Sequence, residues 1–237
     1  MEPLNMLAAT TSLQMALALI TPIVLLVSMY WAFRMLTQRF GLPLGYLLGF
    51  LIYWLFWCLL VPMLILGGWQ PIVGMFLPFP AFNTLNWQTQ LALWWPLIFP
   101  LFFVFVPRIS KANAPILIAS IVLGIIIGIT EEILWRGLYA RLFPNNLWLS
   151  MIYPSILFGL WHLAPQTAVA NRNSGGAASF VIYAIALGLT YSISVQLTQS
   201  IGWATVSHVI HDTLGLGGFA YAAWLKKERG ATLAPEN

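Results

Sequence analysis

The chain has 237 residues, of which 60% are apolar or aromatic and only 7% are charged, against about 25% in a typical soluble domain. So few charges cannot cover a water-soluble surface, and so apolar a chain cannot stay disordered in water. The composition excludes both classes and predicts an integral, multi-pass membrane protein in a lipid bilayer. The net charge of +4 does not indicate a nucleic-acid partner, because the basic residues stand in short clusters between apolar runs.

Seven apolar runs are long enough to cross the bilayer as helices. The first is interpreted as a span and not as a removed signal peptide, since no basic segment precedes it. The expected fold is an all-α, polytopic transmembrane helix bundle of about seven spans, in one membrane domain. The predicted spans are residues 12–33, 43–66, 90–106, 114–140, 147–164, 178–197 and 202–225. Glycines near residue 215 could divide the last run, so six to eight spans are compatible with the sequence.

The longest connection, residues 67–90, contains Trp69, Trp87 and several prolines but no charge. We expect it to lie in the membrane interface or to fold back as a re-entrant loop.

Eight of the ten basic residues fall on one side of a seven-span bundle. They are Arg34, Arg39, Arg108, Lys111, Arg172, Lys226, Lys227 and Arg229. Because Lys and Arg are enriched in cytoplasmic loops, this side and the C-terminus are expected to be cytoplasmic. The small size and short loops are compatible with a bacterial plasma or internal membrane.

Six ionisable side chains lie within the predicted spans or at their ends, although the chain has only six acids and three histidines in all. They are Glu131, Glu132, Asp212, His162, His208 and His211. An ionisable group inside a bilayer costs several kcal/mol unless it is paired, neutralised or hydrated, and it marks a functional site by default.

The first cluster is Glu131-Glu132 followed by Arg136. Glu132 and Arg136 are four residues apart on one helix face with the acid first, which favours an ion pair. Glu131 points about 100° away around the helix and has no partner there. It suits a general acid or base. The alternative is a structural Glu–Arg pair beside a bystander glutamate.

The second cluster places Phe158 one turn before His162. The residues Pro144 to Asn146 predict a hairpin turn, and Glu131 and His162 lie 15 or 16 residues on either side of it. Both are then about 22–24 Å from the turn on antiparallel helices, where they can meet.

In the third cluster, His208 and Asp212 are four residues apart on one face. The carboxylate could orient the imidazole, or it could pair with it only for packing. His211 is interpreted as structural, because its spacing allows proximity to the site without requiring it.

In this order and on separate spans, the three clusters resemble the CPBP family of intramembrane proteases, also called the CAAX protease or ABI family, with its Ras-converting endopeptidase branch. The family pattern is EExxxR, then FxxxH, then HxxxN or a variant of it. The resemblance covers about residues 114–215. The expected division is N-terminal spans without a recognised motif (1–113), a CPBP-like catalytic core (114–225) and a polar tail (226–237).

The resemblance implies that Glu131 and His162 activate a water, which attacks an amide of a membrane-associated protein or peptide. His208 and the last residue of the third motif would stabilise the oxyanion, with Glu132, Arg136 and Phe158 in support. This chain has Asp212 in place of the asparagine, and an ionised aspartate cannot donate a hydrogen bond. Either Asp212 is protonated, or it supports a charged His208 that donates instead.

Other functions use the same residues. The glutamates and histidines could bind zinc, but HExxH spacing is absent and the resemblance favours a mechanism without metal or other cofactor. A silent family member could act as a scaffold or assembly factor for another membrane protein, docking through its many N-terminal tryptophans. These are Trp54, Trp57, Trp69, Trp87, Trp94 and Trp95. A transporter or proton relay is less favoured, because no inverted repeat is seen.

Overall fold

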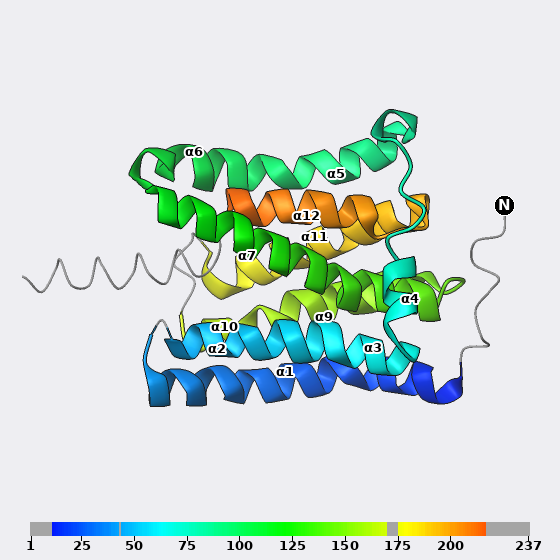
Figure 1. Cartoon of the computed structure of the whole chain (residues 1–237), viewed down its shortest axis with the longest axis horizontal. Coiled ribbons are helices and arrows are strands. Elements are labelled where there is room, and N and C mark those ends of the chain that lie inside the picture. The colour runs from blue at the N-terminus through cyan, green and yellow to red at the C-terminus, as the bar shows by residue number, and fades with distance from the viewer. Residues whose placement is uncertain (1–10, 43, 170–174, 217–237) are drawn as a thin grey trace, which may run out of the picture.

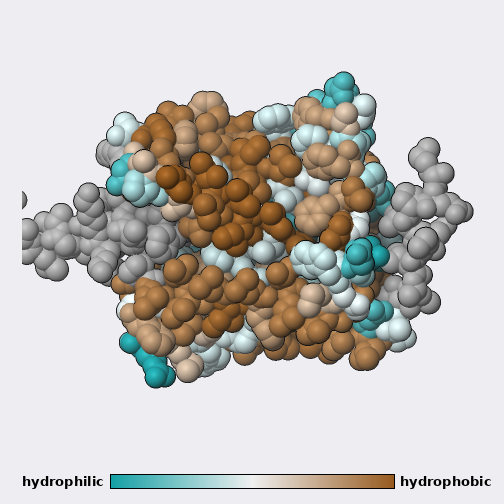
Figure 2. All heavy atoms as spheres, viewed as in Figure 1, coloured by the Kyte–Doolittle hydropathy of each residue, from teal (hydrophilic) through white to brown (hydrophobic). Residues whose placement is uncertain are grey.

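The computed structural model describes residues 11–42, 44–169 and 175–216, which contain helices and no strand. The long helices lie side by side along one common direction (Figure 1). The face of the bundle in Figure 2 is largely apolar, and hydrophilic residues gather toward its ends, as a protein embedded in a bilayer requires. The predicted all-α membrane bundle is confirmed.

Seven helical segments follow the seven predicted spans in order. The first is α1 (Ser12–Phe40), and the second joins α2 (Leu44–Ile52), the π-helical η1 (Tyr53–Leu60) and α3 (Val61–Leu66). The third comprises α5 (Trp87–Phe99), the π-helical η3 (Pro100–Phe105) and α6 (Val106–Arg108). The fourth comprises α7 (Ala114–Glu132), the π-helical η5 (Ile133–Leu138) and α8 (Tyr139–Leu142). The fifth comprises the π-helical η6 (Trp148–Ile152), α9 (Tyr153–Trp161) and α10 (Leu163–Gln166); α11 (Gly176–Thr198) and α12 (Gly202–Leu214) complete the bundle.

Five of these segments are long and apolar enough to cross a membrane by themselves. The other two, residues 148–166 and α12, are shorter and run alongside them in the bundle (Figure 1). The described part of α12 ends at Leu214, so the predicted continuation to residue 225, a possible eighth segment and the polar tail lie outside the described residues.

The long connection after α3 crosses one end of the bundle (Figure 1). It contains α4 (Trp69–Gly74) and the short turn η2 (Phe82–Thr84). Trp203, at the start of α12, donates from its indole N–H to the carbonyl of Pro80 (2.8 Å) and stacks on Phe79. The connection therefore packs against the start of α12 at an end of the bundle, and its place in the membrane interface stays a prediction.

Several connections meet at the opposite end of the bundle (Figure 1). There α1 ends and α2 begins, and α6 leads through the short turn η4 (Ile109–Lys111) into α7. Arg39 and Arg108 lie in the last turns of α1 and α6, so these two predicted basic loops share one side. Arg172 and the basic tail lie outside the described residues.

The contact that positions the site is the close packing of α7 on α12. Gly124 and Gly128 are one turn apart on α7 and face Val209 and Thr213 of α12. A Cβ atom on Gly128 would lie 2.7 Å from the backbone nitrogen of Val209. Small residues of this kind allow membrane helices to approach closely. Glu131 follows Gly128 by three residues and so faces α12 as well.

Replacing Gly128 with leucine should therefore separate α7 from α12 and destabilise the protein by about 1–3 kcal/mol. The unfolding midpoint in detergent would show the loss. Ile125→Leu is the matched control, because Ile125 lies on the same helix and is 44% exposed at the apolar surface. Equal stability of the two variants would contradict the close packing.

Candidate active site

Glu131 and Glu132 are the last two residues of α7, directly before the π-helical η5. Both side chains are buried, with 3% and 0% of their surface exposed. Glu132 Oε1 lies 3.1 Å from Arg136 Nη1, which confirms the predicted ion pair. Glu131 has no partner on its own helix, also as predicted, and its partner comes from α12.

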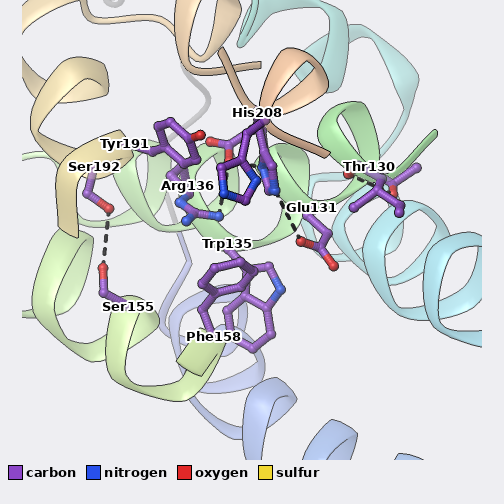
Figure 3. A network of polar contacts seen from close by, with 12 residues as sticks. Thr130, Glu131, Trp135, Arg136, Ser155, Phe158, Tyr191, Ser192 and His208 are labelled. Atoms are coloured by element: carbon purple, nitrogen blue, oxygen red, sulfur yellow. Dashed lines mark hydrogen bonds and ion pairs between the residues drawn. The ribbon is translucent and has the colours of Figure 1, made fainter. Parts of the chain in front are cut away.

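His208 on α12 contacts both glutamates. Figure 3 shows it beside Glu131. Its Nδ1–H donates to Glu132 Oε1 at 2.8 Å, and its Nε2 is 3.6 Å from Glu131 Oε2. The imidazole is 3% exposed and stacks on the ring of Tyr191 from α11, with ring centroids 5.1 Å apart. His208 is therefore fixed by groups on α7, α11 and α12.

Asp212 lies one turn beyond His208 and faces two histidines. Its Oδ2 is 3.6 Å from His208 Nε2, which confirms the predicted proximity within α12. Its Oδ1 is 3.0 Å from Nδ1 of His211. His211 Nε2 in turn lies 3.1 Å from the hydroxyl of Tyr183 on α11. His211, interpreted from the sequence as structural, is thus in contact with the site.

His162 joins the cluster in a different way from the one expected. Its Nδ1 lies 2.8 Å from the carbonyl oxygen of Phe158, and its ring packs edge-on against that phenyl ring. Phe158 also contacts the ring of His208 at a centroid distance of 6.2 Å.

No hydrogen bond or ion pair joins Glu131 to His162, although the count from the hairpin turn placed them at matching depth. That count assumed regular α-helix on both arms. Two π-helical segments, η5 and η6, lie between these residues, and they change the rotation and rise per residue. Glu131 faces His208, and Nδ1 of His162 faces the carbonyl oxygen of Phe158.

Aromatic residues enclose the cluster. The Arg136 guanidinium lies over the ring of Phe158 at 4.3 Å and near that of Tyr191 at 5.4 Å. Trp135 donates from its indole N–H to the Tyr53 hydroxyl (2.8 Å), and this hydroxyl interacts with the Glu131 carboxylate. Phe158 is thus in contact with Arg136 and two histidines, which agrees with the supporting role predicted for it.

Sequence reasoning missed Tyr53, Tyr183 and Tyr191 as members of the site. Each lies in a span for which no motif was recognised, and aromatic residues are common in any membrane helix. The only signal available was a phenol at mid-span, since a buried hydroxyl requires a hydrogen-bond partner.

The charges of the cluster show how it can be stable in a bilayer. Within the described residues it holds three carboxyl groups, Glu131, Glu132 and Asp212, beside the single guanidinium of Arg136. Both ring nitrogens of His208 face carboxylate oxygens, an arrangement that suits a doubly protonated ring. No set of three or more His, Cys, Asp or Glu side chains in the described ranges is arranged to hold a metal ion.

The fold and this cluster define a polytopic helical membrane protein with buried acids and histidines at its centre. Residues 113–214 match the family model described as type II CAAX prenyl endopeptidase, Rce1-like. The matched segment extends from the start of α7 to the end of α12 and includes all three motifs, so this part of the chain is similar to the CAAX protease family. Neither a curated protein nor a solved structure matches the chain.

Proposed function

We propose that the protein is an intramembrane endopeptidase that uses a water activated by Glu131 and His162 to hydrolyse a membrane-associated protein or peptide. The observation that carries the proposal is the buried Glu131 carboxylate, 3.6 Å from the imidazole of His208. It lies inside a segment that matches a family of membrane endopeptidases. We infer a membrane-associated substrate because the cluster lies within a helical bundle that is embedded in the bilayer.

Glu131 acts as the general base. Its neighbour Glu132 is already paired with Arg136 and His208, whereas Glu131 has no guanidinium partner among the described residues. A carboxylate in a site with little water, held by Tyr53 and His208, can take a proton from a water that attacks the scissile carbonyl.

His162 assists Glu131 through its outer nitrogen. Its Nδ1 faces the carbonyl oxygen of Phe158, which can only accept, so Nδ1 carries a proton. In a neutral ring the lone pair is then on Nε2, which can orient the attacking water. After protonation the same nitrogen can donate to the leaving amine.

His208 supplies the oxyanion donor, with Asp212, Glu132 and Arg136 in support. Its Nε2 is 3.6 Å from both Glu131 and Asp212, beyond the 2.7–3.2 Å of a normal hydrogen bond. The N–H at Nε2 is thus available to a third oxygen, such as a developing oxyanion. Of the two possibilities for Asp212, the geometry favours a carboxylate that supports a charged, donating His208.

The reaction we propose requires no metal or other cofactor. Purified protein in detergent should cleave at least one peptide in a panel of membrane-anchored and CAAX-type substrates. Glu131→Ala should cleave none, and a strong chelator should leave the wild type active. Loss of activity with chelator would favour the zinc alternative, and unchanged cleavage by Glu131→Ala would contradict the proposal.

No specific observation favours the alternative of a silent scaffold. Trp54 and Trp57 pack in the core and are not free for a partner. Trp69 and Trp87 are exposed, but both begin a helix at an end of the bundle, where tryptophans anchor membrane helices.

We further propose that the end of the bundle with the α1–α2 and α6–α7 connections faces the cytoplasm. The support is the gathering of basic residues there, among them Arg39 and Arg108.

A further inference from the structure

Asp212 is the one site residue that departs from the family pattern, and its surroundings are unusual. It is the only aspartate in the chain, and it contacts two of the three histidines that the chain contains, His208 and His211. It is also the most exposed acid of the site, since 19% of its side-chain surface is accessible. A carboxylate in this position could turn between several donors, so something must select its orientation.

The two oxygens of Asp212 have different partners. Oδ1 accepts a short hydrogen bond from Nδ1–H of His211, at 3.0 Å. Oδ2 stays 3.6 Å from Nε2 of His208, which is an ion-pair distance and not a hydrogen bond. The hydrogen bond from His211 therefore determines the orientation of the carboxylate. The longer distance to His208 is a consequence of that orientation.

His211 is itself fixed at its other ring nitrogen. The Tyr183 hydroxyl lies 3.1 Å from His211 Nε2 and 3.3 Å from the carbonyl oxygen of Pro96 on α5. The tyrosine ring also stacks on the imidazole, with centroids 6.0 Å apart. Tyr183 thus links α5, α11 and α12, and it leaves the imidazole of His211 one orientation in which both nitrogens have partners.

We propose that His211 and Tyr183 are positioning residues, which hold the Asp212 carboxylate where it stabilises a charged His208 without taking the Nε2–H. This inference rests on the proposed peptidase function, because only an oxyanion donor needs that N–H free. Without His211, the carboxylate can rotate and form a short hydrogen bond with His208. The donor would then be occupied by Asp212 when the oxyanion develops.

The kinetic test compares two substitutions of His211. His211→Leu removes the donor to Asp212, whereas His211→Asn keeps an N–H near the position of Nδ1. We expect His211→Leu to lower kcat about 10- to 100-fold with little change in KM, because a misplaced catalytic group loses rate and not binding. His211→Asn should retain most of the wild-type kcat. Tyr183→Phe should lower kcat by less than His211→Leu.

Tyr153→Phe is the matched control. This tyrosine also donates to a carbonyl oxygen within the bundle, that of Leu19, but it does not contact the Asp212 network. It should keep the wild-type kcat.

A spectroscopic test examines the hydrogen bonding of His208 without measuring activity. Because the chain has only three histidines, ¹⁵N-histidine labelling of a protein with a histidine-free tag gives few signals, which single variants can assign. The His208 nitrogens should report a doubly protonated ring in the wild type. The Nε2 signal should shift in His211→Leu and Tyr183→Phe but not in Tyr153→Phe.

The outcomes separate this inference from the proposed function. If Glu131→Ala is inactive while His211→Leu keeps the wild-type kcat, the peptidase stands and the positioning role is overturned. Unchanged His208 signals in His211→Leu would overturn it as well. If Glu131→Ala cleaves as well as the wild type, or if the wild type cleaves nothing, the proposed function fails and the catalytic role of His211 with it.

Discussion

Replacing Glu131 with glutamine should abolish peptide cleavage and leave the protein folded. Glutamine has the shape of glutamate and can still contact Tyr53 and His208, but it cannot accept a proton from water. The loss of a general base lowers kcat by about 10²–10⁴-fold. The measurement is kcat in detergent for the best substrate of the peptide panel, together with the unfolding midpoint of both proteins.

Thr130→Val is the matched control for this variant. Thr130 is the residue before Glu131 on α7, and its hydroxyl donates within the helix to the carbonyl oxygen of Ile126 (2.8 Å). Valine keeps its shape and buries no new charge, so kcat should stay near the wild-type value. A Glu131→Gln protein that is as active as Thr130→Val would show that another group is the base.

The features that the sequence predicted correctly are those fixed by a single helix. The apolar runs follow from the thickness of the bilayer, and all seven correspond to helical segments. The Glu132–Arg136 pair and the approach of His208 to Asp212 require only a spacing of four residues on one helix. Such contacts hold whatever the neighbouring helices do.

The features that could not be predicted depend on two or more helices. The expected meeting of Glu131 with His162 assumed two regular α-helices, but π-helical turns interrupt both arms of the hairpin. Glu131 faces His208 because Gly124 and Gly128 bring α7 close to α12. A helix-packing glycine shows its role only when the partner helix is known.

Residues outside the motifs complete the site for the same reason. Tyr53 on η1 and Tyr183 on α11 are distant in sequence from the residues they contact, Glu131 and His211. Only the tertiary structure distinguishes them from other aromatic residues in the spans.

The buried charge of Arg136 should be as important for stability as Glu131 is for activity. Arg136 is 1% exposed, and its terminal nitrogens make no hydrogen bond to any described residue. Its charge is compensated by Glu132, at 3.1 Å, and by the aromatic faces of Phe158 and Tyr191. Arg136→Met removes one of the two cationic partners of the buried Glu132 carboxylate and leaves only His208. Breaking a buried ion pair in this way costs about 3–5 kcal/mol.

A second substitution distinguishes the lost ion pair from lost packing. In Glu132→Gln/Arg136→Met both charges are absent, while the glutamine carbonyl can still accept the N–H of His208 at Nδ1. The double variant should therefore be more stable than Arg136→Met alone, because removing a buried pair as a whole is often close to neutral. Unfolding midpoints of the three proteins in one detergent measure this coupling. If both variants lose the same stability, Arg136 contributes through its contacts with the aromatic rings and not through its charge.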